Sequence, residues 1–270
     1  MRPPWAITSN RALRKHYHEL QAGDLFLGML SIKPSEEYIF ADLLDRGIET
    51  FPPLMAQYLS RSKCLQAQIY ERYMPPLTFV ARDRHDLIRA VNLYGEHGVS
   101  AVITKQNRFN CGLGIHFWES FEALYSFVTL TNQSFLLGNL FYPFVVQPFI
   151  KDVTDVRVII LGDYIEAYSR KNPHNFRNNL YFGGEAKEYV LSQEELALCQ
   201  EVMKRGRFPY AHIDLMVTPE GKVYLSEINL RGGLKGAKIS TRDYQAKIEA
   251  IHQEFFNRWL AEHPGAQIIS

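Results

Sequence analysis

Two segments in the C-terminal third of the chain carry residues whose types and spacing suit metal chemistry. Residues 210–217 and 223–229 are both strand-like, and Pro219-Glu220-Gly221 between them predicts a hairpin turn. Alternate side chains of a strand share a face, so Glu227 and Asn229 point the same way. The turn brings Asp214 to within about one residue of the position opposite Glu227, where side chains touch. Two carboxylates and an amide oxygen therefore converge among apolar neighbours.

Such a cluster predicts a magnesium site formed by Asp214, Glu227 and Asn229. Buried carboxylates are costly unless a cation compensates them. Hard oxygen ligands suit Mg²⁺, which proteins hold through one or two carboxylates together with substrate phosphates. Mn²⁺ is the alternative ion. The alternative interpretation is that both carboxylates lie on a solvated face and pair with Lys222 or Lys235.

A lysine and a glycine-containing loop lie upstream of this hairpin. Lys105 ends a β-branched strand and is followed by Gly112-Leu113-Gly114. A lysine beside exposed backbone N–H groups can hold the phosphates of ATP. A Gly-x-Gly sequence alone is common in plain turns, so this signal depends on its neighbours.

Further charged groups lie between the glycine loop and the hairpin. Asp155 and Arg157 share one face of a strand, where an intrastrand ion pair is the alternative interpretation. Arg170, Lys171 and Arg177 surround a polar loop over residues 172–184, which could equally be a solvated surface segment. Taken together, cations, carboxylates and a phosphate-compatible loop on neighbouring strands indicate a nucleotide site.

The predicted elements place these residues in an α+β fold. Residues 1–60 predict a small β/α unit, and antiparallel hairpins flanked by helices follow from residue 144. Gly162-Asp163 is a two-residue hairpin signal between strands 155–161 and 164–170. Helices are expected at about 62–73, 83–98, 120–130, 192–205 and 241–263. Nucleotide sites commonly lie between such layers.

Composition excludes several classes of protein. The 270 residues carry a formal net charge of +1, so no basic surplus indicates nucleic-acid binding. The longest apolar run, 135–150, is interrupted by glycine, asparagine, glutamine and proline and predicts no membrane span. Cys64, Cys111 and Cys199 lie far apart without metal-ligand spacing. Reduced thiols and an N-terminus without a signal-peptide core indicate a cytoplasmic protein.

The order of these segments resembles the ATP-grasp superfamily, and within it the branch of the ribosomal S6 modification enzyme and related glutamate ligases. The similarity covers residues 62–236. The first helix and Pro-x-Thr strand of the family match residues 62–78. Its hinge strand matches Val145-Val146-Gln147-Pro148-Phe149-Ile150, and the Asp-x-Arg strand after it matches Asp155-Val156-Arg157-Val158. Its loop over the phosphates matches Phe176-Arg177-Asn178-Asn179-Leu180 with the glycine pair Gly183-Gly184, and its two metal-binding strands match Ile213-Asp214-Leu215 and Glu227-Ile228-Asn229.

The resemblance implies a role for each matching residue. Nucleotide contacts would come from the lysine, the glycine loop, the hinge, the acidic residue after it and the phosphate loop. These are Lys105, Gly112, Gly114, Gln147, Pro148, Phe149, Asp155, Arg177, Asn178 and Asn179. Arg157 and Arg177 would be catalytic, with Arg157 stabilising the charged transition state. The resemblance also implies Mg²⁺ at Asp214, Glu227 and Asn229.

The implied architecture is a short Rossmann-like domain over residues 1–61 before an ATP-grasp domain over 62–270. The latter would divide into 62–143, with the glycine loop, and 144–270, with the metal site. The chain departs from the branch in its short N-terminal unit, in a glycine loop with only two glycines, and at two further places. Pro148 stands where a glutamate is common, and Arg231-Gly232-Gly233-Leu234-Lys235-Gly236 replaces a loop of small residues.

The implied activity is an ATP-dependent carboxylate–amine ligase acting through an acyl phosphate. Its substrates would be an amino acid or amine and a peptide or small carboxylate, without nucleic acid or membrane partners, and the family suggests homo-oligomers. The alternative is a non-catalytic or kinase-like ATP-binding protein of the same fold.

Overall fold

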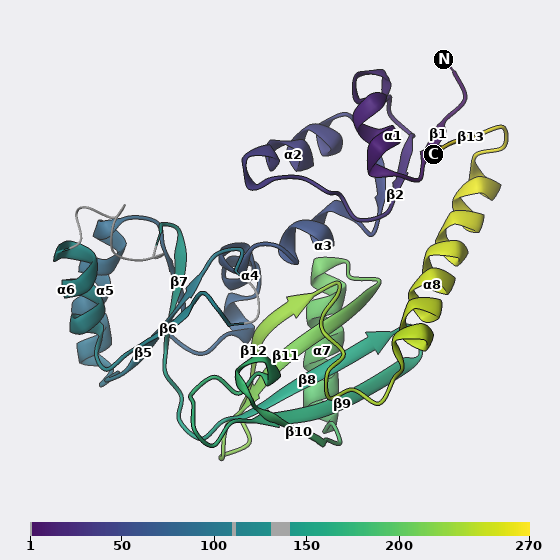
Figure 1. The fold of residues 1–270 in the computed structure, drawn as a ribbon. Coiled ribbons are helices and arrows are strands. Elements are labelled where there is room, and N and C mark those ends of the chain that lie inside the picture. Colours follow the sequence, from purple (N-terminus) through teal and green to yellow (C-terminus); the bar gives the residue numbers. More distant parts are fainter. Residues whose placement is uncertain (1, 110–111, 131–140) are drawn as a thin grey trace.

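The computed structural model describes residues 2–109, 112–130 and 141–270, which form three β-sheets with helices packed against them (Figure 1). One sheet is parallel with the order β13-β1-β2-β3. The other two are antiparallel, with the orders β4-β7-β5-β6 and β10-β9-β8-β11-β12. The predicted α+β class is confirmed.

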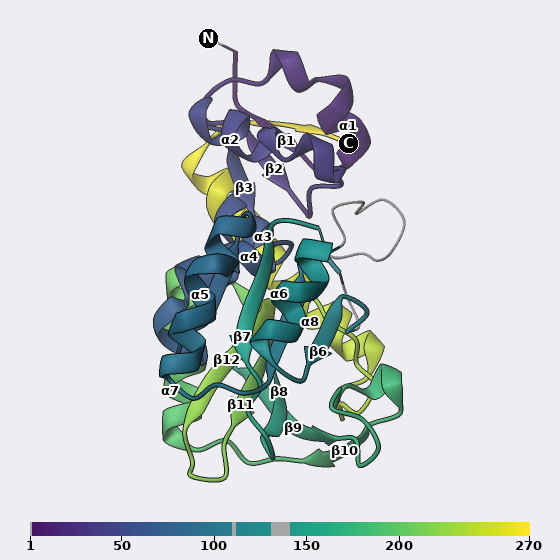
Figure 2. The ribbon, with the colours of Figure 1, turned by 90° about the vertical axis from the view of Figure 1, so that its left-hand side faces the viewer.

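The parallel sheet belongs to the N-terminal unit and is completed by the other end of the chain (Figure 2). β13 pairs with β1, and the Gln267 N–H donates to the Pro4 carbonyl at 2.9 Å. Helices pack on this sheet through a small core that includes Ile7, Phe26 and Leu43. The Rossmann-like character of this unit and its boundary at residue 61 stay predictions. Its elements are β1 (Trp5–Ile7), α1 (Asn10–Lys15), β2 (Leu25–Leu27), α2 (Tyr38–Asp45), β3 (Glu49–Phe51) and β13 (Gln267–Ile269).

Two helices lead from this unit into the four-stranded antiparallel sheet. Ser62 caps the second of them, because its side chain accepts from the Leu65 N–H, and Asp83 caps the next helix in the same way. This stretch holds α3 (Leu54–Leu59), α4 (Lys63–Ile69), β4 (Phe79–Ala81), α5 (Arg84–Glu96), β5 (Val102–Gln106), β6 (Ile115–Trp118), α6 (Phe121–Leu130) and β7 (Phe144–Pro148).

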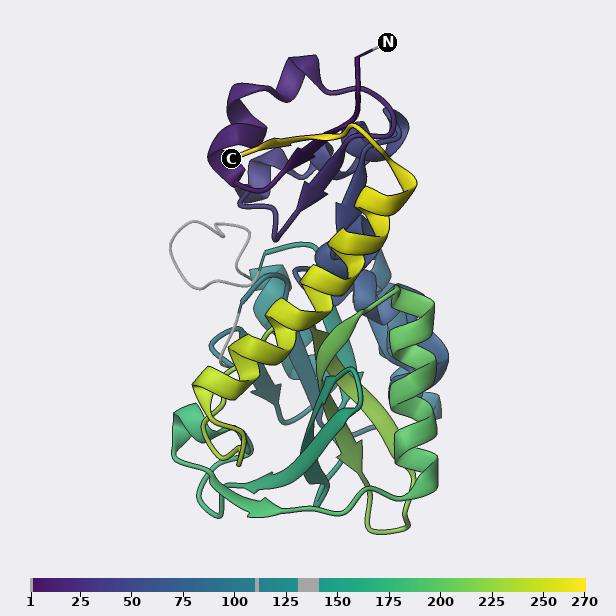
Figure 3. The ribbon, with the colours of Figure 1, turned by 90° about the vertical axis from the view of Figure 1, so that its right-hand side faces the viewer.

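The five-stranded sheet holds the largest core, and helices cover both of its faces (Figure 3). Residues on one face of β11, including Ile213 and Leu215, are fully buried. Its elements are β8 (Thr154–Leu161), β9 (Tyr164–Lys171), β10 (Glu185–Glu188), α7 (Gln193–Gly206), β11 (Tyr210–Val217), β12 (Val223–Asn229) and α8 (Thr241–Glu262). Short 3₁₀ helices occupy Tyr17–Glu19, Pro34–Glu36, Glu71–Tyr73 and Leu180–Phe182.

Helix α8 connects the five-stranded sheet to the N-terminal sheet (Figure 3). Near its start, Tyr244 shares a 2.9 Å hydrogen bond with His212 of β11. Near its end, Trp259 packs in a cluster with Ala6 of β1 and Leu25 of β2. The helix therefore ties both ends of the molecule to one rigid element.

The remaining compositional predictions concern membranes and cysteines. Across the described ranges, no helix combines the length and apolar character needed to cross a bilayer. Cys64 and Cys199 are buried free thiols. Cys111 and the first part of the apolar run, 135–140, lie outside the described residues.

Candidate active site

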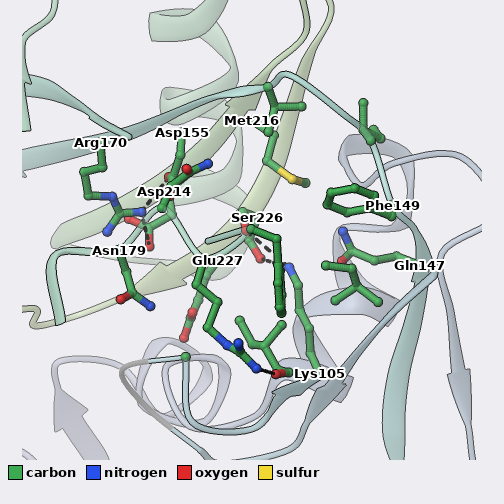
Figure 4. Close-up of a pocket in the computed structure, with 18 of the residues that line it drawn as sticks. Lys105, Gln147, Phe149, Asp155, Arg170, Asn179, Asp214, Met216, Ser226 and Glu227 are labelled. Carbon is green, nitrogen blue, oxygen red and sulfur yellow. Dashed lines mark hydrogen bonds and ion pairs between the residues drawn. The ribbon is translucent and has the colours of Figure 1, made fainter. Parts of the chain in front are cut away.

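A cavity lies between the two antiparallel sheets and is called here the first cavity (Figure 4). One wall comes from β5 and β7, and the opposite wall from β8, β9, β11 and β12. The phosphate loop of residues 176–179 closes a third side. The sequence-predicted residues that line it are Lys105, Gly112, Gln147, Pro148, Phe149, Asp155, Arg157, Arg177, Asn178, Asn179, Asp214 and Glu227.

The β11–β12 hairpin places the predicted metal ligands on one face. Asp214 pairs directly with Glu227, and His212 with Asn229. This confirms the position predicted for the two carboxylates. Asp214 is only 8% exposed, so the alternative of a solvated face is wrong. A bulge after Asp214 shifts the register of the rest of the hairpin.

Two arginines from neighbouring strands hold Asp214. Arg157 donates from Nε and Nη2 to the two Asp214 oxygens at 2.7 and 2.8 Å, a bidentate pair. Arg170 lies 3.1 Å from Asp214 and donates to Asp155 at 2.6 Å. Arg157 and Arg170 both pair with carboxylates on neighbouring strands, so the alternative of an ion pair between Asp155 and Arg157 within one strand is wrong. Burial opposes ionisation of Asp214, but the two arginine charges outweigh it and hold its pKa well below the usual range.

Glu227 is held by a lysine whose place in the site the sequence did not reveal. Lys63 of α4 lies 3.0 Å from Glu227 Oε1 and also donates to the Phe109 carbonyl at 2.7 Å. Burial opposes the ionisation of Glu227, yet the Lys63 charge keeps the pKa of Glu227 below its usual value. The two residues are 164 positions apart, so only the packing of α4 against β12 brings them together.

Lys105 lies on the floor of the first cavity next to this hairpin (Figure 4). Its Nζ donates to the Ser226 hydroxyl at 3.2 Å and to the Ser226 carbonyl at 3.3 Å. Burial lowers its pKa to about 8, and the nearby Glu227 charge opposes that shift. An anionic ligand in the cavity would favour the charged form of this amine.

The glycine loop and the phosphate loop meet at Gly112. Its φ is +75°, and a Cβ there would lie 2.4 Å from Asn179 Nδ2. The space for a side chain is therefore already filled by the phosphate loop. Gly114 does not line the cavity, and a Cβ there would meet the Phe109 and Gln106 side chains at 2.7 and 2.8 Å. Asn110 and Cys111 lie outside the described residues.

The hinge end of the first cavity is apolar and contains one buried acceptor. Phe149 and Met216 both line this end (Figure 4). Gln147 is 3% exposed, and its Oε1 has no hydrogen-bond partner among the described residues. The Phe149 N–H donates to the Ala101 carbonyl at 2.9 Å, so this amide is already used. A flat heterocycle with an exocyclic amine fits here because its N–H would satisfy Gln147.

The phosphate-loop residues are held by bonds within the protein. Arg177 lies over the Phe176 ring at 4.2 Å and donates to the Ile115 carbonyl. The Asn178 side chain accepts from the Asn172 N–H at 3.1 Å, and the Asn179 side chain accepts from the Phe182 N–H at 3.1 Å. Buried Nε atoms of Arg170 and Arg177 have no partner in the described part of the chain. Such orphaned donors suit a phosphate ligand.

A second cavity adjoins the first, and the two share part of their lining. Arg157, Arg170, Asn179 and Glu227 line both cavities. Asn229 lines the second cavity and not the first. The remaining wall comes from the segments that follow β2 and α3, from Leu180 and Tyr181, and from the loop after β12. It comprises Met29, Ser60, Arg61, Leu180, Tyr181, Arg231, Gly232, Gly233 and Lys235.

The proposed metal ligands fit a hard cation by chemical type. Among the described residues, no three His, Cys, Asp or Glu side chains gather as a metal site. Asp214, Glu227 and Asn229 instead offer two carboxylates and one amide oxygen on paired strands. This is the donor set that Mg²⁺ accepts when substrate phosphates complete its coordination. The set could not hold a soft metal ion, since it contains no thiolate or imidazole.

The family model of the RimK-like ATP-grasp domain matches residues 59–251. The chain belongs to this family. The prediction of the ATP-grasp superfamily and of its glutamate-ligase branch is thereby confirmed. A probable alpha-L-glutamate ligase of Trichodesmium erythraeum (strain IMS101) is 31% identical over 225 residues, which cover 81% of this chain and 71% of that protein. A probable alpha-L-glutamate ligase of Aeromonas salmonicida (strain A449) is 26% identical over 199 residues, covering 70% of this chain and 62% of that protein.

Solved structures show the same fold for this RimK-like ATP-grasp chain. The D-alanine–D-alanine ligase of Bacillus anthracis complexed with ATP superposes with a TM-score of 0.60 at 17% identity, covering 94% of this chain and 85% of that one. The D-alanyl-alanine synthetase A of Vibrio cholerae gives a TM-score of 0.56 at 16% identity, covering 89% and 76%. The predicted ATP-grasp fold is confirmed.

Proposed function

We propose that this protein is an ATP-dependent ligase that joins a carboxylate to an amine through an acyl phosphate. The observation that carries the proposal is the facing pair Asp214 and Glu227: both line a cavity suited to a nucleotide, and Glu227 also lines the second cavity. Membership of the RimK-like family and the ligase names of its relatives support it. ATP and Mg²⁺ are the expected nucleotide and metal.

The chain's own groups divide the work of such a reaction. In the proposal, Lys105, Arg177, Asn178 and Asn179 hold the phosphates, while Gln147 and Phe149 face the purine. Asp214, Glu227 and Asn229 would hold Mg²⁺, which would supply positive charge to offset that of the phosphates. Arg157 lines both cavities, so its guanidinium can stabilise charge on the phosphoryl group as it moves to the substrate carboxylate.

The phosphate loop keeps water away from the reacting groups in this proposal. Gly112 and Asn179 are already in contact, so the two loops together cover one side of the first cavity. Water exclusion matters because an acyl phosphate hydrolyses readily before an amine attacks it.

The substrates are proposed as an amino acid or other amine and a peptide or small carboxylate. The relatives from Trichodesmium and Aeromonas are named as glutamate ligases, which makes glutamate the first substrate to test. Structural neighbours also include a peptide ligase from Chryseobacterium gregarium with ADP and leader and core peptides, at a TM-score of 0.54 and 18% identity. Peptide acceptors therefore belong in the same screen.

The proposal is tested by a screen of acid and amine pairs with Mg²⁺-ATP. ADP and phosphate should appear only when both substrates are present, and mass spectrometry should find the condensed product. EDTA should abolish the reaction and added Mg²⁺ should restore it. A phosphorylated alcohol as the product would mean a kinase on this fold, and nucleotide binding without turnover on any pair would mean a non-catalytic protein.

A further inference from the structure

The second cavity has a cationic wall that the nucleotide does not explain. Arg231 and Lys235, from the loop after β12, line this cavity and not the first. Both are exposed, and neither forms an ion pair with any carboxylate of the described residues. Their charges therefore face the cavity without compensation from the protein.

The other cations of this wall are already compensated or bonded. Arg157 and Arg170 are paired with Asp214 and Asp155. Arg61 donates both terminal nitrogens to the Leu30 and Ile32 carbonyls, which fixes it to the N-terminal unit. Glu227, the one carboxylate among the described residues that line this cavity, is held by Lys63. The surplus of positive charge is thus localised at Arg231 and Lys235.

Two glycines hold these cations in place. A Cβ on Gly232, next to Arg231, would lie 2.5 Å from the His212 ring. A Cβ on Gly236, next to Lys235, would lie 2.7 Å from Ala186 and 2.9 Å from Leu180, and its φ is +89°. The loop therefore packs its backbone directly on β11 and on the phosphate-loop side, where no other residue fits.

Further contacts orient the two charged groups. The Lys235 Nζ donates to the Leu180 carbonyl at 3.1 Å, so the lysine lies at the rim shared with the phosphate loop. Near Arg231, burial, with the Arg231 charge as a second cause, lowers the pKa of His252 to about 4. His252 is therefore uncharged at neutral pH and adds no further positive charge beside Arg231.

We propose that Arg231 and Lys235 form a subsite for a second anionic group on the substrate, so that this ligase prefers a substrate with at least one negative charge beyond the carboxylate that it activates. The inference rests on the proposed function and names its substrate class. Carboxylate and phosphoryl groups share the required chemistry, since both accept charge-assisted hydrogen bonds from a guanidinium and an ammonium. The loop that carries both cations is also where the sequence departs from the small-residue loop of the branch.

The first experiment measures binding, independently of turnover. Glutarate, its monoamide glutaramate and 3-phosphonopropionate are titrated into the full chain with Mg²⁺-ADP, and dissociation constants are obtained by NMR. The two acids with a second anionic group should bind about tenfold or more tightly than the size-matched monoamide, as charge-assisted contacts predict. Whichever of the two binds more tightly identifies the second group as carboxylate or phosphoryl.

The second experiment assigns the preference to the two residues. The double variant R231Q/K235Q should bind all three compounds within about threefold of one another, because both anion-binding charges are gone. The matched control K204Q/R205Q removes two exposed cations from the end of α7, outside both cavities, and should keep the preference. Mg²⁺-ADP affinity should be unchanged in both variants.

Three outcomes would overturn the proposal: equal binding of glutarate, phosphonopropionate and glutaramate to the unmodified protein; an undiminished preference in R231Q/K235Q; or a loss of Mg²⁺-ADP affinity in that variant, which would assign the cations to the nucleotide. A failure of the proposed ligase function would give a different set of results. If no acid and amine pair releases ADP while the preference and its loss in R231Q/K235Q are both observed, the proposed function fails and the anion subsite stands.

Discussion

Asp214 is the residue where the chemistry of the site is concentrated. It faces the first cavity, pairs directly with Glu227 and accepts hydrogen bonds or ion pairs from two arginines. Each of these contacts uses the charge of a single buried carboxylate. Its removal should therefore affect both the stability and the activity of the protein.

The variant Asp214→Ala leaves Arg157 and Arg170 without a shared counter-charge, so the free energy of unfolding should fall by about 3 kcal/mol or more. Asp214→Asn keeps the shape and should lose less stability, yet both variants should lower the rate of ADP release at least ~100-fold. Chemical denaturation and a coupled assay check the two effects. Asp163→Ala, in the exposed Lys247–Asp163 pair, serves as the control and should change neither quantity appreciably.

Lys105 makes nucleotide affinity depend on pH. Burial lowers its pKa to about 8, and bound phosphates favour the protonated amine, so affinity for Mg²⁺-ADP should be highest below pH 8. As pH rises through this value the free protein loses the proton that the complex retains. The dissociation constant should then increase about tenfold between pH 7 and pH 9. Isothermal titration across this range measures it.

Adenosine is the matched control ligand for this titration, because it lacks the phosphates that Lys105 would contact. Its affinity should stay constant over the same pH range. A parallel rise in both dissociation constants would show that the pH effect comes from another group. The stability of the ligand-free protein should change with pH in the opposite direction to its nucleotide affinity. The unfolded chain keeps the Lys105 proton to higher pH than the folded protein does, so the free energy of unfolding should rise from about pH 8 to 10.5.

At the scale of elements, the contact between the glycine loop and the phosphate loop decides how the first cavity is covered. Gly112→Ala would place a methyl group 2.4 Å from Asn179 Nδ2 and force the loops apart. We expect KM for ATP to rise about tenfold, with a smaller change in stability from the positive φ. Steady-state kinetics with ATP as the varied substrate measures it.

Gly162→Ala separates steric contact from backbone strain. Gly162 also has a positive φ, +64°, but nothing lies within 4 Å of a Cβ there. This variant should show similar backbone strain and an unchanged KM for ATP. If both variants raise KM alike, the contact with Asn179 is not the cause.

Elements with strong local signals were predictable from sequence. The strands Tyr210–Val217 and Val223–Asn229 agree with the prediction residue for residue, since turn chemistry and apolar alternation point to the same register. The short strands β1, β6, β10 and β13 were missed. Each has only three or four residues and is defined by its partner strand rather than by its own pattern.

The site was predictable where its residues share a hairpin and not where helices supply them. Asp214 and Glu227 follow from strand periodicity. Lys63 does not, because its meeting with Glu227 requires α4 to pack against β12. The actual partners of Asp155 and Arg157 could not be predicted for a similar reason. Arg170 and Asp214 lie on β9 and β11, on either side of β8, and the periodicity of one strand does not show which cross-strand partner is preferred.

At the scale of the whole molecule, α8 and β13 hold the N-terminal sheet to the rest. Removing residues 264–270 would take away the parallel partner of β1 and the Gln267 N–H bond to Pro4. Backbone amides of β1 and β2 should then exchange with solvent at least ~10-fold faster, because local opening becomes easier. Amides of the five-stranded sheet should be unaffected. Hydrogen–deuterium exchange with mass spectrometry resolves the two regions.

The same pairing sets an order on how the chain can fold as it is made. β1 is joined to β13 across 262 positions, as between Trp5 and Gln267. A ribosome therefore releases β1, β2 and β3 long before the strand that covers their open edge exists. A nascent chain would expose that edge until β13 has been made, so the first of the described sheets to be begun is the last of them to be completed.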